Sequence, residues 1–398
     1  MTTLRIAMAQ FDFPVGDVAG NRDRIARMIT EARDEHGADI VLFPELALSG
    51  YPPEDLVLRP AFITACDDAV KTVVRELAGL KGMTVVVGHP VGGDSRTKSV
   101  AVQQRFNAAS VISEGEVLEI YAKRELPNYQ VFDERRYFTP GKGVCVFQAG
   151  EGADRVSVGL LICEDAWYEE PARLAKEAGA DLLAVINASP FHVGKGYERE
   201  DTMRERVLAT GLPMVYAHLV GGQDEVVFEG HSFALDSDGT VAGRAPSFKE
   251  NSFLALVEST QATMKIIAKV EPVRTPEQDL WDALVLGVRD YVGKNGFPGA
   301  ILGLSGGIDS ALVLTIAVDA LGADKVRTVM MPSPYTADIS WLDAREMAQR
   351  MGVRYDEISI VPEFEAFKAS LAGEFAGRAE DTTEENIQAR IRGTLLMA

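Results

Sequence analysis

Three short stretches of the chain end an apolar run with a residue that can do chemistry. A carboxylate, Glu45, follows the run Ile40–Phe43, and a thiol, Cys163, ends the run Val156–Cys163. An amine, Lys123, follows a third strand-like stretch. Because α/β folds place their sites at the carboxyl ends of strands, these three side chains are candidates for one site. Taken singly, each is more often structural, since a lone buried cysteine is usually inert and a lone glutamate or lysine usually faces solvent.

Together the three residues fit the cleavage of an amide by a thiol. Such a reaction needs a base that takes the thiol proton and later returns a proton to the departing ammonia, and Glu45 suits this role. It also needs a cation for the oxyanion of the tetrahedral intermediate, which Lys123 would supply. None of the five histidines is spaced like the partner of a catalytic cysteine. The sequence therefore indicates an amide-cleaving site built on glutamate, lysine and cysteine.

A second stretch, Ser305-Gly306-Gly307-Ile308-Asp309-Ser310, lies between an apolar run and a helical pattern. The run Ala300–Leu304 precedes it, and the pattern Ala311–Leu321 follows it. In this setting a glycine-rich turn points backbone N–H groups and the helix dipole at a phosphate. It is not a Walker A loop, because no Gly-Lys-Ser/Thr follows the glycines. The structural alternative is an ordinary tight turn in which Asp309 and Ser310 cap the helix.

Length, charge and cysteine usage limit the class of protein. At 398 residues the chain is too long for one ordinary core, so two domains are expected. The net charge of −19, from 40 basic and 59 acidic residues, argues against nucleic-acid and anionic-membrane partners. The cysteines Cys66, Cys145 and Cys163 form no CxxC pair, which is typical of a reducing compartment. With neither a signal-peptide pattern nor an apolar run of roughly 20 residues, the sequence predicts a soluble cytoplasmic protein.

Strand-like and helical patterns alternate along residues 4–235, which indicates an α/β layered domain with covered sheets. Prolines in the stretch Glu271–Pro276 mark a linker. The expected domains are therefore 1–262 and 277–398, joined by the linker 263–276. The second domain shows the alternation of a doubly wound parallel sheet, with the glycine-rich turn after its first strand. Its few strands, and a last helical pattern that stops without a cap, predict a truncated version of a longer protein.

Several motifs resemble the Glu-Lys-Cys signature of the nitrilase, or carbon–nitrogen hydrolase, superfamily. They are Phe43-Pro44-Glu45, the stretch around Lys123, Cys163-Glu164-Asp165 and the stretch Leu126–Phe138. The resemblance implies an αββα sandwich that carries a glutaminase. In that family Glu45 would be the proton acceptor, Lys123 the oxyanion stabiliser and Cys163 the nucleophile that forms a glutamyl thioester. Glu134 matches the supporting glutamate of the superfamily. The positions that match glutamine-binding residues are Tyr129, Ser189 and Lys195.

The second half of the chain carries a different resemblance. The segment Ser305–Ser310 looks like the pyrophosphate loop of the N-type ATP pyrophosphatases, and the motifs Met331-Pro332-Ser333 and Glu384–Arg390 resemble the NAD synthetases. A nitrilase-type domain followed by such a domain is the arrangement of the glutamine-dependent NAD synthetase family, and the resemblance covers essentially the whole chain. It implies an amidotransferase ligase with L-glutamine, deamido-NAD and ATP as substrates. It also implies Mg²⁺ with the ATP, no prosthetic group, and a homo-oligomer.

In this family the second domain adenylates deamido-NAD, and ammonia then displaces AMP. The resemblance assigns ATP and pyrophosphate to Gly303, Leu304, Ser305, Gly306, Gly307, Ile308, Asp309 and Ser310. Asn386 matches a position that contacts deamido-NAD, and a helix N-cap is an equal alternative for it. Asp309 is a weak candidate for holding Mg²⁺, since capping the following helix explains it equally well. The family's later segments have no counterpart here, so the chain is expected to lack part of the synthetase site.

Three alternatives stay open on the sequence alone. A stand-alone amidase of the nitrilase type would explain the first domain but leave the second without a role. Another amidotransferase with an ATP pyrophosphatase domain would share the loop, but the GMP and asparagine synthetases resemble different glutaminases. A scaffold protein with inactive sites is disfavoured because the chain keeps Glu45, Lys123 and Cys163.

Overall fold

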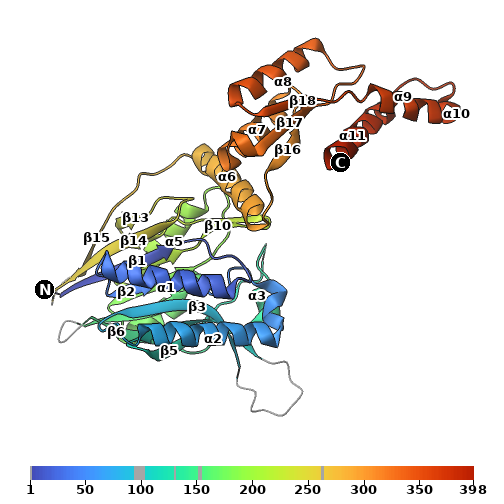
Figure 1. Ribbon diagram of the computed structural model, residues 1–398. Helices are drawn as coiled ribbons and strands as arrows, with labels where there is room; N and C mark the ends of the chain where they lie inside the picture. The colour runs from blue at the N-terminus through green and yellow to red at the C-terminus, as the bar shows by residue number, and fades with distance from the viewer. Residues whose placement is uncertain (1, 94–103, 130, 151–154, 261–263) are drawn as a thin grey trace. The chain divides into compact units, whose positions relative to one another are not determined.

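The computed structural model describes residues 2–93, 104–129, 131–150, 155–260 and 264–398 (Figure 1). Gln130, in the stretch that resembles the nitrilase family, lies outside these residues. Contacts divide the chain into two compact units, Met1–Ala283 and Leu284–Ala398, and each is described here by itself.

The larger unit contains a seven-stranded sheet. Its strands, in spatial order, are β15 (Met264–Ala268), β14 (Asn251–Ser259), β1 (Thr2–Gln10), β2 (Ile40–Leu42), β3 (Thr84–Gly92), β4 (Arg105–Ser113) and β5 (Glu116–Ala122). The central strands β1, β2 and β3 are parallel, and the flanking pairs are antiparallel. The parallel centre brings the carboxyl ends of its strands to one edge of the sheet.

A six-stranded sheet forms the second layer of the same unit. Its strands, in spatial order, are β13 (Val241–Arg244), β12 (Phe233–Leu235), β9 (Met214–His218), β8 (Leu182–Asn187), β7 (Val156–Ile162) and β6 (Cys145–Ala149). Here β7, β8 and β9 are parallel. A separate hairpin pairs β10 (Val220–Gln223) with β11 (Val226–Glu229).

The two sheets pack face to face and each carries helices on its outer face (Figure 1). The inner core follows from the two-residue repeat of strands, since Ile6 and Met8 face the other sheet while Ala7 and Ala9 face helices. The covering helices of the first sheet are α1 (Val18–Asp34) and α2 (Pro60–Leu77), and those of the second are α4 (Glu169–Glu177) and α5 (Lys195–Thr210). The expected αββα sandwich is confirmed.

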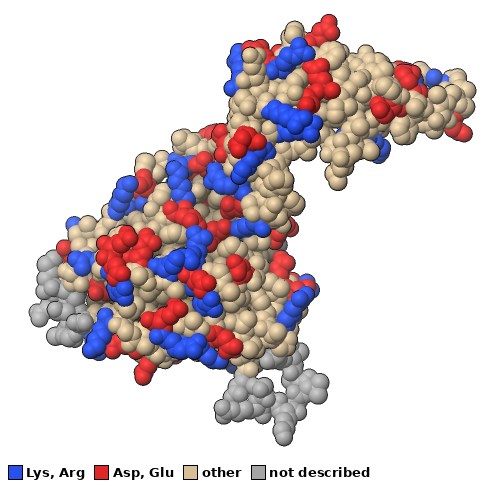
Figure 2. All heavy atoms as spheres, in the orientation of Figure 1, with Lys and Arg blue, Asp and Glu red and all other residues tan. Residues whose placement is uncertain are grey.

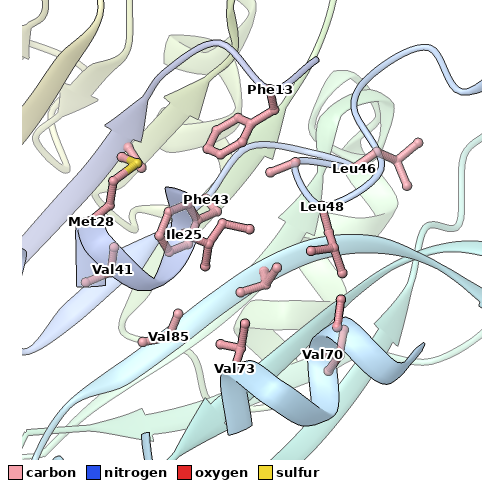
Figure 3. Close-up of a cluster of buried hydrophobic side chains, with 14 of the residues drawn as sticks. Phe13, Ile25, Met28, Val41, Phe43, Leu46, Leu48, Val70, Val73 and Val85 are labelled. Carbon is pink, nitrogen blue, oxygen red and sulfur yellow. The ribbon is translucent and has the colours of Figure 1, made fainter. Parts of the chain in front are cut away.

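Helix α2 shows how the sequence builds this layer. Pro60 stands at its first turn, where the missing N–H costs nothing. Ile63, Val70 and Val73 then recur at helical spacing and are buried. Figure 3 shows Val70 and Val73 directed at Val85 of β3 and the side chains around it. Short helices, η1 (Glu54–Leu58), α3 (Glu134–Tyr137) and η2 (Cys163–Trp167), complete the unit.

The smaller unit is built on a three-stranded parallel sheet, β16 (Ala300–Gly303), β17 (Val326–Met330) and β18 (Arg354–Glu357). Two separate apolar clusters cover its faces, one with α7 (Ile308–Leu321) and α8 (Asp338–Met351) and the other with α9 (Val361–Ser370) and α11 (Thr382–Met397). The remaining elements are η3 (Ala323–Lys325) and α10 (Ala372–Phe375). The expected parallel sheet with helices on both faces is confirmed.

The connection between the units differs from the range expected for the linker. The range 263–276 includes β15, which pairs with β14 in the seven-stranded sheet. After β15 the chain continues to α6 (Pro276–Lys294), a helix that crosses the boundary between Ala283 and Leu284. The prolines at 272 and 276 therefore mark only the short extended segment before α6.

Basic and acidic side chains are interspersed over the visible face of the larger unit (Figure 2). Within the described part of the chain, no helix is long and apolar enough to cross a membrane.

Candidate active site

Glu45, Lys123 and Glu134 meet in one buried cluster in the larger unit. Lys123 Nζ donates to Glu45 Oε1 at 2.6 Å and to Glu134 Oε1 at 2.9 Å. All three side chains are almost fully buried. Glu45 follows β2, Lys123 follows β5 and Glu134 begins α3. The structure thus joins two of the three candidates that the apolar runs indicated, together with the supporting glutamate.

The carboxylate of Glu45 is held from both sides. Its Oε1 also accepts from Asn107 Nδ2 at 2.7 Å, and its Oε2 accepts from the backbone N–H of Ala188 at 3.0 Å. The loop that carries Glu45 approaches β3 closely at Gly88, where a Cβ would lie 2.5 Å from Pro44 O. A side chain at Gly88 would therefore displace Glu45. Asn107 belongs to β4, and no motif in the sequence marked it. Ala188 lies after β8 beside the predicted Ser189, but no sequence pattern assigned a role to its N–H.

The carboxylates of Glu45 and Glu134 both contact the ammonium group of Lys123, and this arrangement determines the protonation of the site. Burial raises the pKa of Glu134 even though Lys123 and the hydroxyl of Tyr51 donate to it. Burial alone would lower the pKa of Lys123, but the neighbouring Cys163, Glu134 and Glu45 hold it well above its ordinary value. Lys123 is therefore a permanent cation, as the stabiliser of an oxyanion must be.

Cys163 stands on a sharp turn beside this cluster. It is the first residue of η2, is 1% exposed and has a φ of 47°, a left-handed value that is costly for a residue with a side chain. Burial, and then the charge of Glu45, raise the pKa of the Cys163 thiol well above its ordinary value. At rest Cys163 is a neutral thiol, so a role as nucleophile would require a base at the moment of attack.

Asp165 ties the turn of Cys163 to the segment that carries Lys123. Its Oδ1 accepts from the N–H groups of Arg124 and Glu125, and its Oδ2 accepts from Tyr121 O–H and from the N–H of Ile162. Burial raises the pKa of Asp165 to about 6, and the hydrogen bonds from Glu125, Ile162 and Tyr121 act against that rise. One carboxylate therefore fixes the residue before Cys163 relative to the residues after Lys123. The motif Cys163-Glu164-Asp165 included Asp165, but the sequence did not show that Asp165 connects these two segments.

The three predicted glutamine-binding residues lie around the same site. Tyr129 O–H donates to both carboxylate oxygens of Glu164 at 3.1 Å. Lys195 Nζ pairs with Glu198 at 3.2 Å and lies 4.0 Å from the centre of the Trp167 ring. Glu164 was not singled out as a binding residue, and its place directly after the nucleophile is the signal that could have found it.

Ser189, the third of these residues, is nearly buried after β8. Its Oγ accepts from Asn187 Nδ2 and from Arg199 Nη2. A cavity of about 610 Å³ opens beside the charged cluster, and its lining includes Tyr51, Glu134 and Pro190. This volume is in the range of small-molecule sites.

A second buried ion network anchors α5, the helix that begins with Lys195. Arg244 donates to Glu200 Oε1 at 2.6 Å and to Oε2 at 2.8 Å, and His231 Nε2 lies 2.8 Å from Oε1. Burial would raise the pKa of Glu200, but the hydrogen bonds from Arg244 and His231 hold it at about 2. Because this value lies below the ordinary 4.5, the carboxylate stabilises the fold above pH 4.5 and loses that contribution as pH falls toward 2.

We therefore expect Glu200→Gln to lower the free energy of unfolding by about 3 kcal/mol at pH 7, and by progressively less as pH falls from 5 to 3. Urea unfolding at several pH values measures this. The exposed Glu205→Gln on the same helix is the control and should change stability little. An equal loss for Glu200→Gln at pH 7 and pH 3.5 would contradict the assigned ion network.

In the smaller unit the loop from Ser305 to Ser310 is closed by its own hydroxyls. Ser305 N donates to Ser310 Oγ at 3.2 Å, Gly307 N donates to Ser305 Oγ at 3.2 Å, and Ser310 Oγ donates to Gly307 O at 2.9 Å. The N-cap of α7 is Gly307, without a side-chain cap bond. The alternative in which Asp309 and Ser310 cap the helix is therefore wrong, since both lie in its first turn. A cavity of about 380 Å³ borders Gly306 and Gly307.

Gly306 allows the loop to close against α8. Its φ is 79°, and a Cβ there would lie 2.1 Å from Ser340 O. We expect Gly306→Ala to lower the free energy of unfolding by about 3 kcal/mol, through the left-handed backbone and this clash. Gly307→Ala is the matched control, because φ at Gly307 is −88° and a Cβ would lie 3.4 Å from Ser305 Oγ. Equal effects of the two changes in urea unfolding would refute this assignment.

Asn386 lies in the second turn of α11. The N-cap of that helix is Asp381, which forms a capping box with Glu384. Capping therefore does not account for Asn386, and the structural alternative proposed for it is wrong. Arg390 Nη1 lies 3.5 Å from Asn386 Oδ1.

The αββα sandwich with a buried glutamate–lysine pair beside a thiol on a sharp turn defines the class of the larger unit as a carbon–nitrogen hydrolase. Residues 5–265 match the sequence profile of the family "Carbon-nitrogen hydrolase", and residues 280–398 match that of "NAD synthase". The chain is 48% identical over 398 residues to a "Glutamine-dependent NAD(+) synthetase" of Xylella fastidiosa (strain Temecula1), covering 99% of this chain and 70% of that protein. It is 39% identical to the protein of the same name from Thermotoga maritima, covering 72% of it. The chain belongs to the glutamine-dependent NAD(+) synthetase family.

Solved structures show the same two similarities. The glutamine-dependent NAD+ synthetase of Acinetobacter baumannii, in complex with ADP, has a TM-score of 0.90 at 39% identity, covering 99% of this chain and 72% of its own. The Nesterenkonia AN1 amidase of the nitrilase superfamily, as a C145A mutant, has a TM-score of 0.54 at 25% identity. That match covers 66% of this chain and 92% of the amidase.

Proposed function

We propose that the protein hydrolyses L-glutamine at Cys163 and uses the ammonia to convert ATP-activated deamido-NAD into NAD. The observation that carries the first half is the buried cluster of Glu45, Lys123 and Glu134 beside Cys163. The match of residues 280–398 to the NAD synthase family supports the second half and disfavours a stand-alone amidase. We also propose that the glutaminase domain includes β15 and that the synthetase domain follows it in the chain.

The first step of hydrolysis follows from the charges. Glu45 takes the thiol proton as Cys163 Sγ attacks the γ-amide carbon, and Lys123 Nζ stabilises the oxyanion. Glu45 then gives the proton to the amide nitrogen, the C–N bond breaks, and ammonia leaves a γ-glutamyl thioester on Cys163. In the second step Glu45 takes a proton from water, which attacks the thioester. Return of that proton to the sulfur releases glutamate and restores the thiol.

The residues around the cluster suit the other end of glutamine. Lys195 supplies a cation for the α-carboxylate. Its ion pair with Glu198 supports this role, because this ammonium group is placed to bind a carboxylate. Glu164, held by Tyr129, supplies a carboxylate for the α-ammonium group. Burial raises the pKa of Glu164, and a cationic partner favours its charged form.

In the synthetase reaction the carboxylate of deamido-NAD attacks the α-phosphorus of ATP and pyrophosphate leaves. The loop Gly303–Ser310 would bind pyrophosphate through its N–H and hydroxyl groups, and Asn386 would contact deamido-NAD. Mg²⁺ suits this site because Asp309 offers an exposed carboxylate in the first turn of α7, and the ion would neutralise phosphate charge. We further propose a cytoplasmic homo-oligomer in which ammonia passes between the sites by an enclosed path.

Exchange of labelled pyrophosphate into ATP tests the synthetase half in the full-length gene product. We expect exchange that requires deamido-NAD and Mg²⁺ and does not require glutamine. Exchange that proceeds without deamido-NAD, or with another acceptor acid in its place, would contradict the proposed substrate.

A further inference from the structure

The hydroxyl of Ser189 has both of its acceptor positions occupied. Asn187 Nδ2 donates to Ser189 Oγ at 3.0 Å, and Arg199 Nη2 donates to it at 2.9 Å. A serine hydroxyl has two acceptor lone pairs and one hydrogen to donate. Among the described residues the structure gives that hydrogen no acceptor. Ser189 therefore faces a ligand only as a hydrogen-bond donor.

Arg199 keeps the Ser189 hydroxyl available only as a donor to a ligand, because a guanidinium has hydrogen-bond donors and no acceptor. Its side chain is completely buried on α5, and Nη1 donates to Glu229 Oε1 at 2.7 Å. Burial acts to lower the pKa of Arg199, but the charge of Glu229, its hydrogen bond and the neighbouring Tyr216 together outweigh burial, and the pKa lies above its ordinary value. Arg199 is therefore always charged, and one of its N–H groups always points at Ser189.

Folding stability alone does not account for the pair of Arg199 and Glu229. Arg199 Nε and Glu229 Oε2 are buried and have no hydrogen-bond partner among the described residues. Desolvation of two charges commonly cancels their attraction, and unpaired buried polar atoms add a further cost. The ion pair of Arg199 and Glu229 therefore contributes little to folding stability. Its contact with Ser189 indicates a role in the site instead.

Helix α5 also supplies a cation, Lys195, that can pair with a carboxylate. Lys195 lies four residues before Arg199, which places the two residues on one face of α5. Lys195 is the proposed partner of the glutamine α-carboxylate, and Ser189 is nearly buried beside Arg199. Helix α5 therefore brings the cation for the carboxylate and the guanidinium that orients the serine.

We propose that Arg199 is a positioning residue for the α-carboxylate of glutamine. By occupying an acceptor position of Ser189, it makes the serine hydroxyl an obligatory donor to a carboxylate oxygen whose charge Lys195 neutralises. The site therefore selects γ-amides that carry a free α-carboxylate. This inference rests on the proposed glutaminase function.

Steady-state glutamine hydrolysis by Arg199→Met, Ser189→Ala and the double variant tests the inference. We expect each single change to raise KM for glutamine about 10- to 100-fold while kcat changes less than about threefold. We expect the double variant to be no worse than Ser189→Ala, because both changes remove the same contact. Arg199→Lys, which keeps a charge and can donate to Ser189, should restore part of the loss. Arg206→Met on the same helix is the matched control, since Arg206 is also buried but pairs with Glu169 and Glu205.

The substrate comparison separates positioning from a merely structural role. 4-Aminobutanamide is glutamine without its α-carboxylate, and we expect Arg199→Met to leave its kcat/KM within about threefold of wild type. Equal losses on both amides, or additive losses in the double variant, would overturn the role of Arg199. If Arg199→Met does not fold, the same comparison with Arg199→Lys and Ser189→Ala decides. A wild-type chain that releases no glutamate from glutamine would instead contradict the proposed function itself.

Discussion

Cys163→Ala is expected to lower glutamine hydrolysis by about 10⁴-fold or more, because it removes the thiol that lies beside Glu45 and Lys123. The thiol is small and fully enclosed, so its loss should leave substrate binding largely intact. Glutamate release over time measures the effect. Cys163→Ser should be nearly as inactive, since a serine hydroxyl is a weaker nucleophile than a thiol with the same base.

The other two cysteines are matched controls for this experiment. Cys66 and Cys145 are also free and buried, and burial raises the pKa of each thiol to about 12. Cys66 packs between the first sheet and its covering helices, and Cys145 packs in the core between the two sheets. Alanine at either position should cost about 1 to 2 kcal/mol of stability and leave kcat for glutamine within about threefold. Full glutaminase activity in Cys163→Ala, with loss in Cys66→Ala, would refute the assignment of the nucleophile.

Lys123→Met should remove activity and also destabilise the fold. We expect at least about a 10³-fold loss of kcat from the missing oxyanion partner. We also expect the free energy of unfolding to fall by about 3 to 5 kcal/mol, because Glu45 and Glu134 would be left buried, unpaired and adjacent. Circular dichroism during urea unfolding and glutamate release measure the two effects separately.

The pH dependence of this destabilisation follows from the carboxylates. Without Lys123, burial and then the charge of Glu45 raise the pKa of Glu134 in the folded state above the unfolded value. The folded variant then takes up a proton as pH falls, so the stability lost at pH 8 should be partly recovered near pH 5. Glu134→Gln in the Lys123→Met background should recover stability at pH 8. A loss that is independent of pH, and unaffected by Glu134→Gln, would show that the ion cluster is not what Lys123 stabilises.

The sequence predicted the elements that carry the site because their patterns are local. The buried strands β2, β7 and β8 are continuous apolar runs, and α2 repeats apolar residues at helical spacing. The strand β15 was missed because only one of its five side chains is buried and its role depends on pairing with β14. Prolines nearby then suggested a linker across residues that belong to the sheet.

The sequence predicted those site residues whose role can be read from a single motif. It did not predict residues whose role depends on contacts between distant elements. Glu45, Lys123 and Cys163 each end a strand pattern, so their types and positions were sufficient to propose the chemistry. Asn107 and the N–H of Ala188 act on Glu45 through contacts that join distant parts of the chain. The cap expected at Asp309 failed for a local reason, since a shift of the helix start by two residues makes Gly307 the N-cap.

One protein is expected to couple glutamine hydrolysis to NAD formation through Cys163 and the loop at Ser305–Ser310. The most direct measurement is NAD formed from deamido-NAD, ATP and Mg²⁺ by the full-length gene product, with glutamine or with ammonium as nitrogen source. We expect Cys163→Ala to abolish synthesis from glutamine and to leave synthesis from ammonium near the wild-type rate. Loss of both activities together, or glutamine-driven synthesis that survives the change, would contradict the account.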